Sequence, residues 1–61
     1  TEKFQELVMD ILQSESFAKR GFVIPEEAIR LYKKHLSGEV NVAKDIWKWI
    51  NLELWFREFI D

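Results

Sequence analysis

The residues of this chain that could carry catalytic or metal-binding chemistry are few and widely spaced. His35 is its only histidine, and the chain has no cysteine. A zinc site draws on several His or Cys ligands, and a histidine base needs a nucleophile or an acid beside it. The neighbours Lys34 and Leu36 supply neither. We therefore predict no metal site and no catalytic residue, and interpret His35 as a helix-terminal residue at the negative end of the helix dipole.

The eleven acidic residues are spaced as solvated faces and helix caps, without the closely spaced carboxylates that hold a hard cation. Glu53 differs from the rest because it lies within an apolar stretch. A buried carboxylate needs a partner, and Arg57, four residues later, is the local candidate. We predict a structural role for Glu53. Gly21 and Gly38 are the only glycines, so no Gly-rich phosphate loop exists and no cofactor is expected to bind this chain.

The size and charge of the chain exclude several functional classes. Its 61 residues make one small domain at most, with a marginal core. Its net charge is −2 and its Lys and Arg residues are spread along the chain, so it lacks the basic patch of a nucleic-acid-binding protein. No run of roughly 18 uncharged apolar residues is present, and we predict no membrane span. The absence of cysteine makes the reducing cytoplasm the default compartment.

Hydrophobic periodicity predicts an all-α fold, with residues 1–61 forming one small three-helix unit. The last helix is expected to be the longest and to begin after Asn41, a strong N-cap residue. The helices are predicted at about residues 2–13, 25–37 and 42–60. The residues expected to form the internal core are Phe4, Leu7, Val8, Ile11, Ile29, Tyr32, Ile46 and Ile50.

The connections between these helices carry recognisable turn signals. Residues 14–23 are expected to be a connector in which residues 16–20 form one short turn, closed by Gly21 at positive φ. Pro25 suits the first position of the second helix, where its missing N–H has no partner to lose. Gly38 is expected to end that helix as a left-handed cap.

The predicted last helix is apolar on two opposing flanks. At 100° per residue, one flank carries residues that would close the three-helix unit, namely Ala43, Ile46, Trp47, Ile50 and Leu54. The other flank is predicted to be an interface, formed by Trp49, Leu52, Trp55, Phe56 and Phe59. A helix that is apolar nearly all round is buried on more than one side. A chain of this size has too little material to cover both flanks, so we expect a partner surface.

Three segments of the chain together resemble the C-terminal end of glutamine-dependent asparagine synthetases. The first reads S-x-x-F-x-x-R-G over residues 14–21, and an apolar pair with Pro25 follows it. The second is the His35-x-x-Gly38 helix end. The third is the N-L-E-L-W core of the last helix, at residues 51–55. The similarity covers nearly the whole chain.

The resemblance implies a structural part of a larger enzyme. Members of the family release ammonia from glutamine with an N-terminal cysteine and activate aspartate with ATP and Mg at an S-G-G-x-D-S loop. Neither motif occurs in this chain, and no catalytic residue of the family maps onto it. The implied partner is the rest of a synthetase domain, on which the family's helical tail packs. Related amide-forming cyclases share the layout, so the substrate of the parent stays open.

A second interpretation is a free-standing helical module for protein–protein interaction. It would use the same aromatic flank to bind a partner helix or to associate with a second copy of itself.

Overall fold

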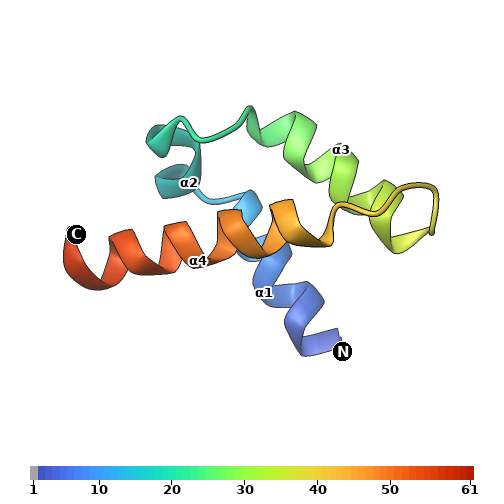
Figure 1. The fold of residues 1–61 in the computed structure, drawn as a ribbon. Helices are drawn as coiled ribbons and strands as arrows, with labels where there is room; N and C mark the ends of the chain where they lie inside the picture. Colours follow the sequence, from blue (N-terminus) through green and yellow to red (C-terminus); the bar gives the residue numbers. More distant parts are fainter. Residues whose placement is uncertain (1) are drawn as a thin grey trace.

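The computed structural model describes residues 2–61, and Thr1, the first residue of the predicted unit, lies outside them. Residues 2–61 form four α-helices, whose arrangement is shown in Figure 1. Residues 2–61 contain no β-strand, so the predicted all-α class is confirmed. The helices are α1 (Glu2–Leu12), α2 (Glu15–Arg20), α3 (Pro25–Leu36) and α4 (Ala43–Phe59). One more helix is present than the three expected, because the turn predicted at residues 16–20 is a six-residue helix, α2.

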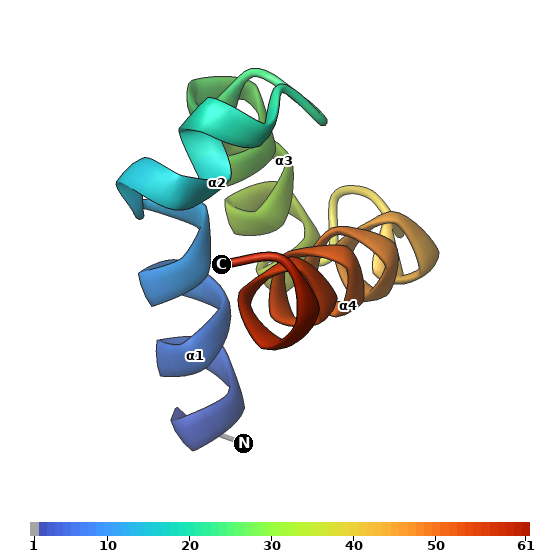
Figure 2. The same ribbon diagram turned by 90° about the vertical axis from the view of Figure 1, so that its left-hand side faces the viewer.

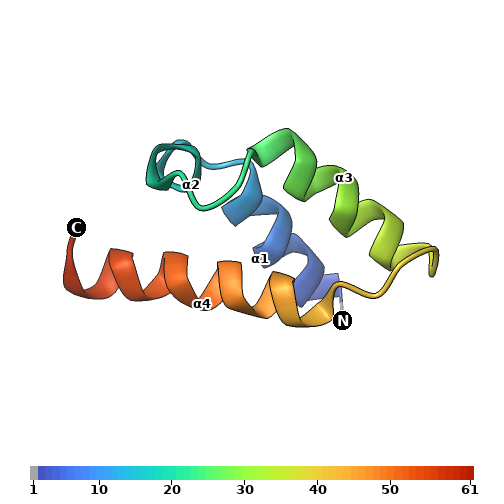
Figure 3. The ribbon, with the colours of Figure 1, turned by 45° about the horizontal axis from the view of Figure 1, so that its top comes forward.

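Helix α1 is the central element of the fold, since it contacts each of the other three helices. Figure 2 looks along α4 from its C-terminal end and shows α1 beside it, with α2 and α3 above. Figure 3 shows α4 as a long rod whose C-terminal half extends past α1 and α3. That half of α4 therefore has neighbours on fewer sides than its N-terminal half.

The turns follow the sequence signals closely. Ser14 caps α2 by accepting a hydrogen bond from the Phe17 N–H at 3.2 Å, and Gly21 ends that helix at φ +76°. The predicted N-cap of α4 is off by one residue: Val42 holds the cap position without a side-chain bond, and Asn41, just before it, accepts from the Ala43 N–H through Oδ1 at 3.2 Å. His35 lies in the last turn of α3, and its Nδ1 accepts a hydrogen bond from the Val42 N–H at 3.2 Å. This bond ties the end of α3 to the start of α4.

The hydrophobic core joins residues of all four helices: Val8, Ile11, Leu12, Phe17, Ala28, Tyr32, Ile46 and Ile50. Five of the eight predicted core residues are among them, and the predicted Phe4 and Ile29 are half-buried against the core. The prediction for Leu7 is wrong, since this side chain is 40% exposed. Leu7 stands at the edge of the apolar stripe of α1, about 100° from Val8, and no other helix reaches that edge. Phe17, from the unpredicted helix, occupies core space instead.

Candidate functional site

A buried carboxylate at the contact between α2 and α4 is the most polar feature of the interior. The Glu53 side chain is fully buried, and Arg20 from α2 donates to both of its oxygens. The Arg20 Nε–Glu53 Oε1 distance is 3.0 Å, and Arg20 Nη2 lies 3.3 Å from Glu53 Oε2. An ion pair with two such bonds fixes geometry as well as charge. Arg20 therefore locks α2 onto the middle of α4.

Three further side chains complete this network around Glu53. Ser16 Oγ donates to Glu53 Oε2 at 2.6 Å, and Arg57 Nε donates to the same oxygen at 2.8 Å. Arg57 Nη2 also donates to the hydroxyls of Ser14 and Ser16. Among residues 2–61, no buried side-chain nitrogen or oxygen atom lacks a hydrogen-bond partner. A fully satisfied buried network stiffens a contact and specifies its register.

The network extends outward from Arg20 to Asp61 and Phe56. Arg20 Nη1 lies 3.0 Å from Asp61 Oδ1, and its guanidinium carbon stands 5.0 Å from the centre of the Phe56 ring. Phe56 also packs on Phe22, with ring centres 5.6 Å apart. Arg20 thus binds a buried acid, an exposed acid and an aromatic face at once, and these contacts hold the C-terminal half of α4.

The electrostatics of the network favour the ionised carboxylate. Burial raises the pKa of Glu53, but hydrogen bonds from Arg20, Ser16 and Arg57, with the charge of Arg20, outweigh it, so its pKa lies below the ordinary value. The hydrogen bond from Arg20 likewise lowers the pKa of Asp61. In return, Asp61 and Glu53 raise the pKa of Arg20 above its already high ordinary value. A carboxylate held in this way is a poor general acid or base near neutral pH.

The sequence analysis identified only part of this network. It predicted a structural Glu53 paired with Arg57, and the structure contains that pair. It missed Arg20 and Ser16, which lie more than thirty positions away from Glu53 in the chain. Both lie within or beside the S-x-x-F-x-x-R-G pattern, and Glu53 is the acid of N-L-E-L-W. The two patterns quoted for the resemblance therefore meet at one contact.

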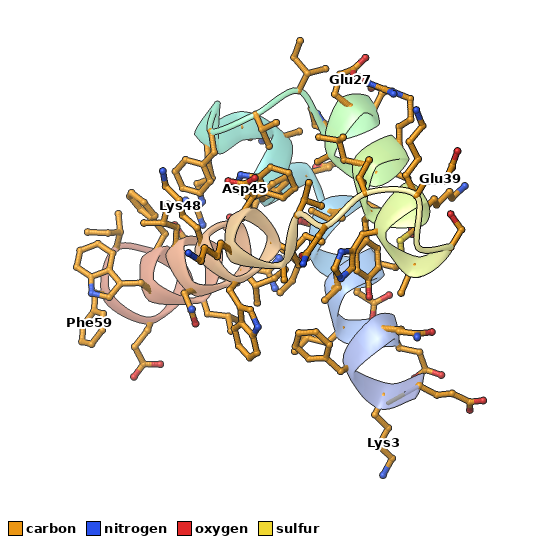
Figure 4. All side chains as sticks on the ribbon, turned by 45° about the vertical axis from the view of Figure 1, so that its right-hand side comes forward. Lys3, Glu27, Glu39, Asp45, Lys48 and Phe59 are labelled. Atoms are coloured by element: carbon orange, nitrogen blue, oxygen red, sulfur yellow. The ribbon has the colours of Figure 1, made fainter. Side chains whose placement is uncertain are left out.

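The five residues predicted as an interface occupy different depths of the surface. Trp49, Leu52 and Phe56 are half-buried, and Trp49 packs against the core. Trp55 and Phe59 are 49% and 67% exposed, and their rings contact each other with centres 5.4 Å apart. Figure 4 shows Phe59 projecting at the end of α4 farthest from α1. The exposed part of the predicted interface is thus the Trp55–Phe59 end of α4.

Trp47 and Leu54 were assigned to the flank that closes the unit, yet they are 54% and 41% exposed. That assignment is wrong for both residues, because α1 and α3 cover a narrower arc of α4 than expected. Trp47 makes one aromatic contact, with Phe4 of α1, at a ring-centre distance of 5.2 Å. The face of α4 that lacks cover is therefore broader than the predicted interface.

His35 lies at a separate hollow within the described residues. The hollow, of about 220 Å³, lies between α1, α3 and α4 and is lined by Tyr32, His35 and Trp47 among others. His35 Nδ1 already accepts the Val42 N–H, and no acid stands beside the ring in the contacts of residues 2–61. No group of three or more potential metal ligands occurs in residues 2–61. Over the same residues, no helix is both long enough and apolar enough to cross a membrane.

Comparison with known proteins gives a family match. Residues 1–57 match the family model of asparagine synthase, which covers all four helices except the end of α4. Neither the comparison with curated proteins nor that with solved structures gives a match. The matched range includes the S-x-x-F-x-x-R-G and N-L-E-L-W segments, which meet at Glu53. The chain belongs to the asparagine synthase family.

Proposed function

We propose that this chain is the structural, C-terminal helical part of an asparagine-synthetase-like, ATP-dependent amidotransferase and has no catalytic activity alone. The observation that carries this proposal is the family match over residues 1–57 of a chain that lacks the family's phosphate loop. Arg20 and Glu53, one from each of two family-like segments, are engaged in holding α2 to α4. Their role in this proposal is to position helices.

The parent enzyme in this proposal converts aspartate, glutamine and ATP to asparagine in the cytoplasm. ATP and Mg bind to its synthetase domain, outside this chain. The helical part rests on that domain through the Trp55–Phe59 end of α4, where large apolar side chains are exposed. Apolar patches of this kind mark interaction surfaces on folded proteins.

Two experiments test this proposal. The first is to read the gene upstream of Thr1, where an S-G-G-x-D-S loop in the same frame is expected. The second is to assay the purified chain for aspartate-dependent ATP–pyrophosphate exchange. We expect no exchange above that of buffer. An upstream frame without the loop contradicts the synthetase assignment, and measurable exchange contradicts the non-catalytic role.

A free-standing interaction module is the competing candidate, and the exposure of Trp47 and Trp55 favours it. The two candidates differ in the size of the polypeptide that contains this chain in the cell. A part of a synthetase is found covalently joined to its parent domain, whereas a module is found as a separate polypeptide of about 7.4 kDa. Detection of the chain in cell extract with an antibody against it distinguishes the two by apparent mass.

A further inference from the structure

One face of α4 carries a regular row of exposed side chains, of which the functions above use only Trp47 and Trp55. Taken at 100° per residue, each of them lies within about 60° of Asn51, whereas the buried Ile50 and Glu53 lie about 100° and 160° from it. We call this row the outer stripe. It consists of Lys44, Trp47, Lys48, Asn51, Leu54, Trp55 and Glu58, all of which are exposed.

The outer stripe is symmetric about Asn51 at a distance of four residues and complementary in charge at seven, but it is not symmetric at three. Three residues away on either side stand Lys48 and Leu54, and four residues away stand Trp47 and Trp55. At seven residues the side chains have opposite charge, since Lys44 and Glu58 occupy those positions. A second α4 laid antiparallel across the first, with Asn51 on the axis, therefore places Lys44 opposite Glu58 and Trp47 opposite Trp55.

We propose that this face binds a second copy of the same chain, with the two α4 helices antiparallel about a two-fold axis at Asn51. Such an interface is isologous, so each favourable pair occurs twice. The spacing of three and four residues along the stripe is the one by which packed helices interdigitate at a small crossing angle.

The chemistry of the stripe matches that of known interfaces. Trp47 and Trp55, 54% and 49% exposed, form its apolar centre with Leu54, and tryptophan is the residue most enriched at binding hot spots. The Lys44 and Glu58 pairs lie at the rim, about 10 Å along the helix from the axis, where they set orientation. The Asn51 amides meet on the axis, where each can both donate and accept a hydrogen bond.

A parallel arrangement does not have this complementarity. There Lys44 faces Lys44 and Glu58 faces Glu58, so that both ends repel. Charge therefore selects the antiparallel register. The inference does not rest on the synthetase assignment: the two surfaces share Trp55, but Lys44, Asn51 and Glu58 lie off the predicted flank of Leu52 and Phe59.

Charge reversal at the rim tests the proposal by sedimentation of the purified chain over a series of concentrations. The wild-type chain is expected to dimerise. Lys44→Glu and Glu58→Lys should each weaken self-association about tenfold, since either change turns two attractive pairs into two repulsive ones. An equimolar mixture of these two variants should regain wild-type dimerisation as a heterodimer, because every rim pair is then of opposite charge.

Lys3→Glu, which reverses an exposed charge on α1 outside the stripe, serves as the matched control and should leave the dissociation constant unchanged. Circular dichroism of each variant verifies that the helices still form. A wild-type chain that stays monomeric through the series overturns the proposal. So does a Lys44→Glu chain that self-associates as well as wild type, which is the outcome expected of a parallel pair.

Asn51→Cys gives a second, independent measurement of the register. The chain has no other cysteine, so any disulfide joins the two introduced thiols. On mild oxidation, the dimer of this variant should cross-link faster than that of a Lys19→Cys control, whose position on α2 is exposed and outside the stripe. Equal rates for the two variants contradict a two-fold axis at Asn51.

Discussion

The inner and outer faces of α4 are both rich in apolar residues, yet they differ in what covers them. On the inner face, Ile46 and Ile50 are buried against α1 and α3, and Glu53 is buried under α2. On the outer face, Trp47 and Trp55 remain about half exposed. A single helix thus contributes to a closed core on one side and leaves an open apolar surface on the other. Composition alone does not distinguish the two faces, because the difference arises from which short elements reach α4.

The largest effect should come from removing the aromatic side chain by which α2 enters the core. Phe17 is fully buried, and its truncation to Ala removes about 3–5 kcal/mol from a domain with little stability to lose. We expect Phe17→Ala to be largely unfolded at 25 °C by circular dichroism. Retention of a cooperative melt near that of the wild type would contradict the placement of α2 against the core.

The next largest effect should come from neutralising Glu53, the charged residue on the inner face of α4. Glu53→Gln keeps the shape of the side chain but removes the buried charge that Arg20 and Arg57 share, so that Arg20 retains Asp61 and Arg57 loses its ion pair. Because Arg57 is partly solvated, we expect a loss of about 3 kcal/mol, the lower end for a broken buried ion pair. In a domain of this size that lowers the melting temperature by more than about 10 °C. Glu6→Gln, at an exposed position of α1, is the control and should shift it little.

Acid should weaken the same contact without any substitution. The folded-state pKa of Glu53 lies below the ordinary value, so the unfolded chain binds more protons in the acid range. The stability that this group contributes is complete above the unfolded pKa of about 4.3 and is lost as pH falls through the lower folded value. Asp61 acts in the same direction. Urea unfolding at a series of pH values should show this fall, and the fall should be smaller in Glu53→Gln.

The contrast between these two faces also shows how much the sequence alone could predict. The three long helices follow from apolar periodicity, and turns at Gly21 and Gly38 follow from residue type. Helix α2 was not predicted as a helix because six residues carry too little periodicity to distinguish them from a turn. The pairing of its Arg20 with Glu53 depends on a contact more than thirty residues apart in sequence.

Predictions of burial from helical periodicity failed for a similar reason at single residues of α1 and α4. The stripe of α1 includes Leu7 by spacing, but only the arc facing α3 and α4 is covered. Trp47 and Leu54 were placed on the covered flank of α4 because helical angles give the direction of a side chain and not the extent of its neighbours. A pattern that predicts which residues share a face therefore leaves open how wide a face the rest of the chain covers.

A smaller effect should come from substituting Gly21, in the turn that ends α2. Gly21 has φ +76°, and a Cβ added there meets nothing within 4 Å, so the cost of Gly21→Ala is conformational. We expect a loss of about 1 kcal/mol in urea unfolding. Gly21→Asn should lose less, because Asn tolerates this conformation better. If Asn destabilises the chain as much as Ala does, backbone conformation is not the cause.

The smallest effect should come from the outer face, and a matched deletion measures the comparison directly. Leu12 is fully buried and Leu54 is 41% exposed, so the same change to Ala removes the same atoms from two environments. Leu12→Ala should cost about 2–5 kcal/mol, whereas a surface substitution such as Leu54→Ala should stay within about 0.5 kcal/mol. Both variants must be unfolded in urea at a protein concentration where the wild-type chain is monomeric. Self-association through the outer stripe would otherwise stabilise the wild-type chain and enlarge the loss measured for Leu54→Ala, but not the loss for Leu12→Ala. Equal losses in the monomer would mean that the chain covers both faces of α4 by itself, and the outer face would then be no more available to a partner than the core.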